Sequence, residues 1–392
     1  HPHPLCGTIY FSEQFECLRK ATLHPMTQPQ IDLPTVRFAR DTTGFAKTLR
    51  QRVEAYFKEN GIHKKANGAM VFKTILLVSL YLGPVGFIAG GITGGGWMFW
   101  TAEIVMGLAL AGIGMAVMHD GNHGAYSENK AVNRLVGGVL ELVGGNSEMW
   151  QIQHNVLHHT FTNIDGLDED INPGPLLRFS PLKPLKPWHK FQHLYAWFFY
   201  GLMTLIWVTF KDFVALNRYR KAGLLDRMGK SYNNLMFRII LAKVLYFPIV
   251  LGLPLAFSGL GVGQIMAGWL LMHFIGGLTL ALVFQPAHVM EDHDYVMAEK
   301  GGQMEIDPMS HQLKTTCNFG TKSKLLTWYS GGLNHQIEHH LFPHICHVHY
   351  RSIAPIVKAT AQEYGLPYRA ETSFAGAIQL HMHHLKELGR TA

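Results

Sequence analysis

The stretch WMFWTAEIVMGLALAGIGMAVMHDGNHG, residues 97–124, joins an apolar run to a pair of histidines. The part up to Met118 contains one charged residue, Glu103, and is long enough to cross a bilayer as a helix, which takes roughly 20 residues. His119 and His123 follow at once, and residues four apart share one face of a helix. This stretch therefore predicts a membrane-spanning helix with two imidazoles converging at its end.

Three further runs, at about residues 74–93, 237–257 and 264–287, are equally apolar and complete two hairpins with 97–118. The linkers at 90–96 and 258–263 hold no Lys or Arg, whereas basic residues crowd the regions before the first and third runs. The positive-inside rule then places both chain ends and the long middle region in the cytoplasm. We expect an all-α integral membrane protein, with four transmembrane helices in two hairpins and a cytoplasmic helical cap that holds a His-rich metal site.

A fifth apolar stretch, LYAWFFYGLMTLIWVTF at residues 194–210, is rich in aromatic side chains. A crossing here would place the histidines before it and those after it on opposite sides of the membrane. Because these histidines belong together, we expect the stretch to lie in the membrane interface. A fifth full span is the alternative.

Composition restricts the class of protein. Charged residues make up 16% of the chain and hydrophobic residues 48%, which excludes a disordered chain and a coiled coil. The net charge of +7 is too diffuse to indicate nucleic-acid binding, and the four cysteines form no CxxC pair or disulfide framework. Residues 1–25 precede the first methionine, lack the pattern of a signal peptide and are expected to be a non-native or disordered leader. Residues 26–73 would form a cytoplasmic N-terminal segment, and 74–392 the membrane domain.

Histidine is the unusual residue, with 24 copies. WQIQHNVLHHTFTN carries His154, His158 and His159, and adjacent histidines in a helix point about 100° apart, toward two different ions. GGLNHQIEHHLFPH repeats the device with Gln336, His339 and His340, and His288 ends the fourth apolar run. Clusters of this kind beside the bilayer predict a metal site.

The number of ligands points to two ions. Eight imidazoles exceed the four ligands that one tetrahedral zinc needs, so two ions about 4–7 Å apart fit better. Imidazole suits iron, copper and zinc alike, and redox chemistry on a membrane substrate would select iron. The candidate metal ligands are His119, His123, His154, His158, His159, His288, His339 and His340.

The boxes HDGNH, HNVLHH and QIEHH, in this order around two hairpins, resemble those of the membrane fatty-acid desaturases. GGLNHQIEHHLFP, with Gln in place of a first histidine, is similar to the front-end branch (delta-5 and delta-6 type). The stretches HTFTNIDGLDEDI and LFPHICHVHY resemble those of bacterial acyl-lipid or acyl-CoA desaturases. The resemblance extends over about residues 36–368. It implies a centre of two non-haem iron ions held by the eight histidines, O2 as co-substrate, and a cis double bond made in an acyl chain that is linked to CoA or to a phospholipid. Gln336 would be a catalytic position, bridged to one ion by water.

The resemblance also implies a partner. The sequence holds neither the HPGG haem motif of a fused cytochrome b5 domain nor a strand–GxGxxG–helix pattern for a flavin or nicotinamide. Electrons would then come from a separate ferredoxin- or cytochrome b5-type donor with its reductase. The expected location is a bacterial inner membrane, with the site on the cytoplasmic side. A hydroxylase on the same scaffold is the alternative, and a divalent-metal transporter a remote one.

Other polar residues receive simpler expectations. Asp120, Asp165, Asp168 and Glu338 are candidates to orient imidazoles by accepting their second N–H. His273 is expected to be hydrogen-bonded inside the helix bundle. Three histidines near the C-terminus are expected on a solvated face: His381, His383 and His384. Three near the third box would support the metal ligands from behind: His344, His347 and His349.

Overall fold

The computed structural model describes residues 36–290, 294–295 and 302–391, and most of these are in helices. Two short parallel pairings join distant segments: β1 (Arg37–Phe38) with β2 (Gln303–Met304), and β3 (Asn318–Phe319) with β4 (Ala370–Glu371). The prediction of an all-α protein is confirmed. The expected leader, residues 1–25, lies outside the described residues.

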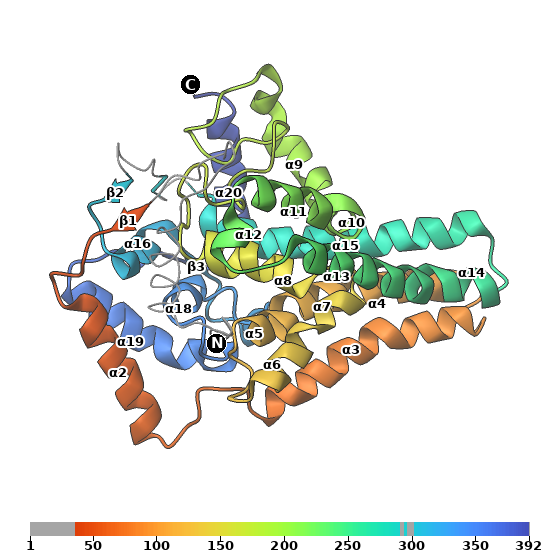
Figure 1. Ribbon diagram of the computed structural model, residues 1–392, viewed down its shortest axis with the longest axis horizontal. Helices are drawn as coiled ribbons and strands as arrows, with labels where there is room; N and C mark the ends of the chain where they lie inside the picture. The colour runs from red at the N-terminus through yellow and green to blue at the C-terminus, as the bar shows by residue number, and fades with distance from the viewer. Residues whose placement is uncertain (1–35, 291–293, 296–301, 392) are drawn as a thin grey trace.

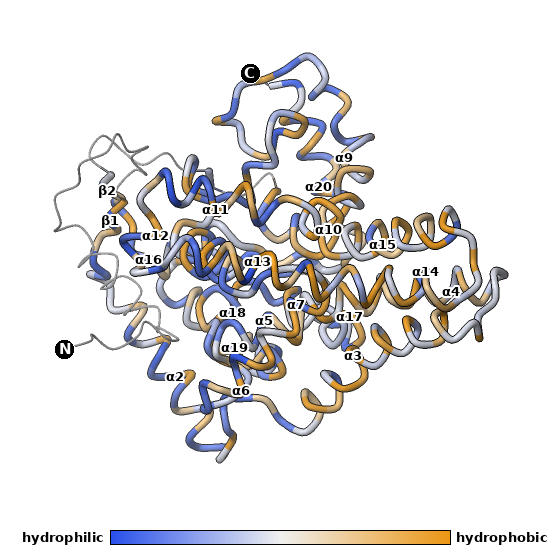
Figure 2. Tube along the Cα trace, turned by 45° about the vertical axis from the view of Figure 1, so that its right-hand side comes forward, coloured by the Kyte–Doolittle hydropathy of each residue, from blue (hydrophilic) through white to orange (hydrophobic). Residues whose placement is uncertain are grey.

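Four long apolar helices extend to one side of the molecule (Figure 1). They are α3 (Gly68–Ala89); α4 (Trp97–Gly112) with η2 (Ile113–Val117) and α5 (Met118–Asn122); α13 (Tyr232–Phe247) with η6 (Pro248–Gly252) and α14 (Leu253–Phe257); and α15 (Val262–His288). Figure 2 shows how strongly apolar this side is. The four predicted spans and their hairpins are confirmed.

Two of these helices begin earlier than the apolar runs do. The Asn67 side chain accepts a hydrogen bond from the backbone N–H of Met70, and Ser231 does the same for Asn234. These N-caps start each helix in polar sequence, several residues before the hydrophobic run. The helices therefore begin at Gly68 and Tyr232, before the predicted spans at 74 and 237, because hydropathy records the apolar stretch and not the helix.

Small residues let the second and fourth spans approach closely. A Cβ atom on Gly107 would lie 2.5 Å from the carbonyl oxygen of Met272, and one on Gly268 would lie 2.4 Å from the ring of Phe99. Such contacts are typical of helix pairs in membranes, where close packing replaces the hydrophobic effect. This packing aligns the ends of α4–α5 and α15, which carry His119 and His288.

The aromatic stretch at 194–210 is not one straight helix. η4 (Pro187–Phe191) and α9 (Gln192–Gly201) meet α10 (Met203–Ile206), η5 (Trp207–Lys211) and α11 (Asp212–Lys221) at a bend of 52°. Buried hydrogen bonds fix the bend, from Thr204 to the carbonyl oxygen of His273 and from Lys243 to Asp212. A bent pair suits an element that turns within the interface, which stays a prediction.

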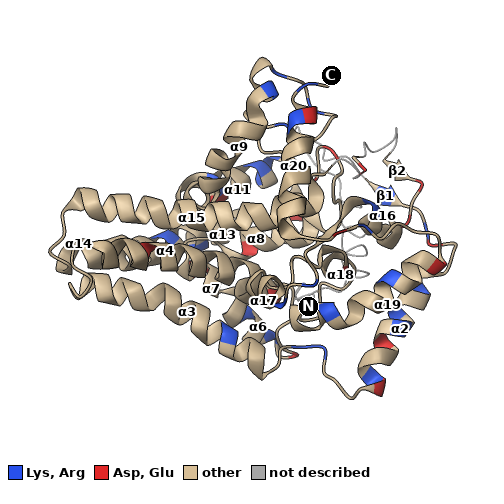
Figure 3. Cartoon of the chain, turned by 180° about the vertical axis from the view of Figure 1, so that it is seen from behind, with Lys and Arg blue, Asp and Glu red and all other residues tan. Residues whose placement is uncertain are grey.

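The remaining elements form a cap at the opposite side, where the charged side chains gather (Figure 3). Its floor is the pair α2 (Phe45–Glu59) and α19 (Tyr350–Glu363), whose apolar faces enclose Ile337 and Leu341. Those two residues belong to α18 (Gln336–Leu341), so the third histidine box is fixed by the cap's own core. The other cap elements are α6 (Lys130–Gly137), α7 (Val139–Leu142), α8 (Ser147–Trp150), η3 (Gln151–His158), α12 (Leu224–Arg227), α16 (Pro308–Thr315), α17 (Lys324–Tyr329), η7 (His347–His349) and α20 (Phe374–Leu388).

Candidate metal centre

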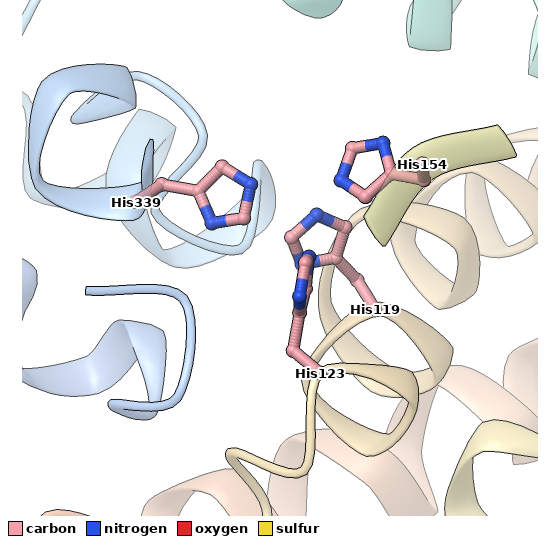
Figure 4. Close-up of side chains that lie close together, drawn as sticks. All are labelled: His119, His123, His154 and His339. Carbon is pink, nitrogen blue, oxygen red and sulfur yellow. The ribbon is translucent and has the colours of Figure 1, made fainter. Parts of the chain in front are cut away.

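Four imidazoles from three elements converge where the second span meets the cap. His119 and His123 come from the end of α5, His154 from η3 and His339 from α18. One nitrogen of each lies within 4.8 Å of one nitrogen of every other. Figure 4 shows the His339 ring facing the other three rings. This set, called group one below, has the spacing that a single ion needs.

A second set adjoins it. The nitrogens of His158, His288 and His340 also lie within 4.8 Å of one another, and those of His159, His339 and His340 form an overlapping triangle. The Nε2 atom of His159 is 2.9 Å from Nε2 of His339 and 3.2 Å from Nε2 of His154. We call His158, His288 and His340 group two. All eight predicted residues are thus brought together in one buried region.

The second histidine box differs from expectation in its local geometry. His154 and His158, four residues apart, do share a face, with stacked rings whose centroids are 5.2 Å apart. The helix is not an α-helix, however: η3 is a π-helix, and the N–H of His159 bonds to the carbonyl of His154 five residues back. The wider turn puts His159 beside His154, with ring centroids 4.7 Å apart, and His158 beside His288. His158 and His159 still point to different neighbours, as predicted.

The protonation and contacts of the rings suit a metal. The Nε2 atoms of His119, His123 and His158 are buried and have no hydrogen-bond partner within the described part of the chain. Burial and the neighbouring imidazoles hold the pKa of His154, His159, His339 and His340 well below its usual range. Neutral imidazoles with free lone pairs are the form that binds a divalent ion. The residues therefore fit a pair of metal ions.

Acceptors behind the rings fix which nitrogen points inward. The Nδ1 atom of His158 lies 3.1 Å from both oxygens of Asp168, and although burial opposes it, Asp168 and Asp170 raise the pKa of this ring. Nδ1 of His340 lies 2.8 Å from Oε1 of Gln312. With one nitrogen held from behind, the other faces the centre. Nδ1 of His288 and of His339 have such partners too, in the Thr315 carbonyl and the Tyr350 hydroxyl.

Two of the four predicted orienting acids do not act on ligands. Asp165 pairs with Lys183 at the surface, and Glu338 accepts hydrogen bonds from Asn318 and Tyr368. Asp168 does lie behind the ring of a candidate ligand, and Asp120 accepts hydrogen bonds from His347 and Cys346. The neutral acceptors Gln312, Thr315 and Tyr350 were missed because they lie in no recognisable motif.

Gln336 sits in group two. Its Nε2 atom is 2.8 Å from Nε2 of His288 and 3.4 Å from Nε2 of His340, and its Oε1 is buried without a partner among the described residues. Our expectation paired Gln336 with His339 at i, i+3. The helix instead turns it toward His340 at i, i+4.

For the other histidines, some of the expectations are confirmed and others are wrong. His273 is hydrogen-bonded inside the bundle to Tyr246 and Thr204, as predicted. His381 and His384 are buried rather than solvated, because α20 turns them inward onto the hydroxyls of Tyr200 and Tyr295; His383 alone of the three is exposed. Near the third box, His347 bonds to Asp120, and the His349 ring bonds to the Lys65 carbonyl, away from the imidazoles.

Comparisons with known proteins agree with this geometry. The model of the fatty acid desaturase family matches residues 95–372. The sn-1 linoleoyl-lipid 6-desaturase of Synechocystis sp. is 33% identical over 89% of this chain and 96% of its own. An acyl-lipid (8-3)-desaturase of Physcomitrium patens is 35% identical, over 88% of this chain and 72% of its own, and the Delta(5) fatty acid desaturase A of Dictyostelium discoideum is 30% identical, over 88% and 75%. Four membrane-length helices, three histidine boxes meeting at one end and these similarities place the chain in the fatty acid desaturase family, as an oxidoreductase that desaturates acyl chains.

Proposed function

We propose that this desaturase is an O2-dependent di-iron enzyme that makes a cis double bond in the acyl chains of membrane glycerolipids, at a position near the carboxyl end. The convergence of eight imidazoles, seven of them buried and His123 half-buried, is the observation that carries the proposal. The relatives' names supply the substrate class and position, since they are acyl-lipid desaturases of the 6 and (8-3) types. An acyl-CoA substrate is the alternative.

Group one would hold one iron ion and group two the other, with His159 between them. Iron bound here would supply the oxidising power, drawn from O2, that removes two hydrogens from an unactivated methylene pair. The balance requires two further electrons and two protons for each O2 reduced to water. These electrons would come from a separate ferredoxin- or cytochrome b5-type protein.

The chain's own residues prepare the place for this chemistry. The Phe284 ring packs against the rings of His154, His158 and His288, so an apolar wall from the fourth span lies directly beside the ligands. Acceptors behind the rings hold each imidazole in one orientation. Such an enclosed site would keep water away from the reacting atoms when the metal is bound.

The charges near the span ends support a cytoplasmic position for the cap. A bacterial inner membrane is the location that we propose. Single cysteines at Gly95 and Gly261, in the two hairpin turns, should then react with a membrane-impermeant maleimide added outside intact cells. A cysteine at Lys221 should react only after lysis. If Gly95 and Gly261 react from opposite sides, the two-hairpin topology is wrong.

Expression in a bacterium that lacks polyunsaturated lipids tests the activity directly. Lipids would be separated by head group, and their fatty acids mapped for double-bond position. A product two hydrogens lighter, appearing first in intact glycerolipids, supports the proposal. A product heavier by one oxygen would identify a hydroxylase, and one appearing first in acyl-CoA would overturn the substrate class. Iron would be measured on the purified protein.

A further inference from the structure

The first span contributes a buried lysine to the neighbourhood of the centre, although it supplies no histidine. Lys73 lies in α3 and is 2% exposed. Its ammonium donates to the carbonyl oxygen of Trp328 at 2.6 Å and lies 2.8 Å from Nε2 of His347. It also sits 5.1 Å from the centre of the Trp328 ring. Lysine is almost never fully buried without a partner or a function.

The ammonium fixes the direction of a hydrogen-bonded chain. An ammonium can only donate, so Nε2 of His347 must accept and the ring proton stays on Nδ1. That Nδ1 donates to Oδ2 of Asp120 at 2.8 Å. The Cys346 thiol donates to the same oxygen at 2.9 Å. One chain of hydrogen bonds with a fixed direction therefore joins the first span to α5, from Lys73 through His347 to Asp120.

Asp120 is the residue through which this chain reaches the metal centre. It directly follows His119 in α5, on the same turn that leads to His123. On the far side of the same turn, a Cβ atom on Gly121 would lie 2.4 Å from the backbone nitrogen of Gly137. The turn is thus held from two directions, by packing on α6 and by the carboxylate.

Asp120, Cys346 and His347 are close enough to hold an ion themselves. Lys73 argues against that use, because its ammonium already takes the His347 lone pair that a metal would need. The cation also lies where a second positive charge would be repelled. The cluster of Asp120, Cys346 and His347 therefore supports the neighbouring metal centre and is not a third metal site.

We propose that Lys73 and His347 are positioning residues for the metal centre: they hold Asp120, and through it the α5 turn, so that His119 and His123 face the other two histidines of group one. The inference rests on the proposed function, since it presumes that group one binds iron. It assigns to the first span a role in the reaction centre that its sequence, with no histidine, does not suggest.

Purified protein reconstituted with ⁵⁷Fe provides the test, through bound iron, its Mössbauer spectrum and its rate of release to a chelator. Lys73→Met should release one of the two ions 10–100-fold faster, the range seen when the partner of a metal ligand is lost. Lys73→Arg, which keeps a donor cation, should restore much of that loss. Lys243→Met is the matched control, because Lys243 is another buried lysine in a span and bonds to Asp212 and the Gly144 carbonyl instead.

The expected pattern is that Lys243→Met lowers the melting temperature yet keeps wild-type iron and spectrum. If Lys73→Met also keeps both ions with unchanged release, or if both lysine variants lose iron alike, the inference is wrong. Should Lys73→Met fail to fold, His347→Gln carries the same prediction, because it breaks the link and leaves Lys73 its Trp328 contact. A wild-type protein that does not bind two irons would refute the proposed function itself.

Discussion

Gly331 offers a sharp test of how the third histidine box is held. Its φ is +61°, and a Cβ atom there would lie 2.2 Å from the carbonyl oxygen of Met115 and 2.7 Å from Cα of Ala116. Both of these belong to η2, immediately before His119, while Gly331 lies just before α18. This glycine is therefore where the loop of the third box touches the backbone of the first.

Gly331→Ala should lower the free energy of unfolding for two separate reasons. A left-handed residue with a Cβ costs roughly 1–2 kcal/mol, and overpacking against fixed backbone costs roughly 1–3 kcal/mol more. We expect a loss of about 2–5 kcal/mol together with loss of bound iron, because η2 and α18 must move apart. Gly365→Ala is the control, since its φ is +66° and nothing lies within 4 Å of its Cβ position.

The two variants would be compared by thermal unfolding in detergent and by iron content. Gly365→Ala should show only the backbone cost and should keep its iron. If the two variants lose the same stability, or if Gly331→Ala keeps full iron and activity, the close approach does not set the geometry of the centre.

Three further predictions follow from single contacts. Asp168→Asn should weaken iron binding roughly 10–100-fold, whereas Asp165→Asn should leave it unchanged, as measured by chelator competition. Gln336→Ala should keep most of the iron and lose activity, while His339→Ala should lose both; equal loss of iron would make Gln336 a direct ligand. Burial lowers the pKa of His381 to about 4. The unfolded chain therefore binds a proton near pH 6.5 that the folded chain binds only near pH 4. The contribution of His381 to the free energy of unfolding should be fully present above pH 6.5 and should be lost toward pH 4, by up to roughly 3 kcal/mol. The free energy of unfolding of His381→Gln, measured against pH, should fall less steeply than that of the wild type.

The spans and their pairing were predictable because the length of each uninterrupted apolar run decides them. A bilayer requires a fixed length of apolar helix, and the uncharged turns at 90–96 and 258–263 mark the hairpins without reference to tertiary structure. The limits were less predictable. Asn67 and Ser231 start their helices by hydrogen bonds to the backbone, and such caps do not change the mean hydropathy of a window.

The meeting of the histidines was predictable for a similar reason, since histidine spacing on a helix limits which rings can meet. The π-turn of η3 was not, because no residue in QIQHNVLH demands a wider helix than its neighbours do. The same holds for Gln312 and Tyr350, which are neutral residues that acquire a role only where the fold sets them behind a ring. The two buried histidines of α20 were missed because an amphipathic helix of mixed composition does not reveal which side is covered.

The asymmetry of the site follows from one amide. Group one is made of four imidazoles, whereas group two has three and is completed by Gln336, whose Nε2 approaches His288. An amide nitrogen carries two hydrogens and is no ligand, so only the unpartnered Oε1 could turn toward an ion or a water on it. Two ions bound here would therefore differ in their protein ligands, with the poorer set on the side of Phe284 and the fourth span. This difference between the two groups follows from residue 336 being Gln and not His.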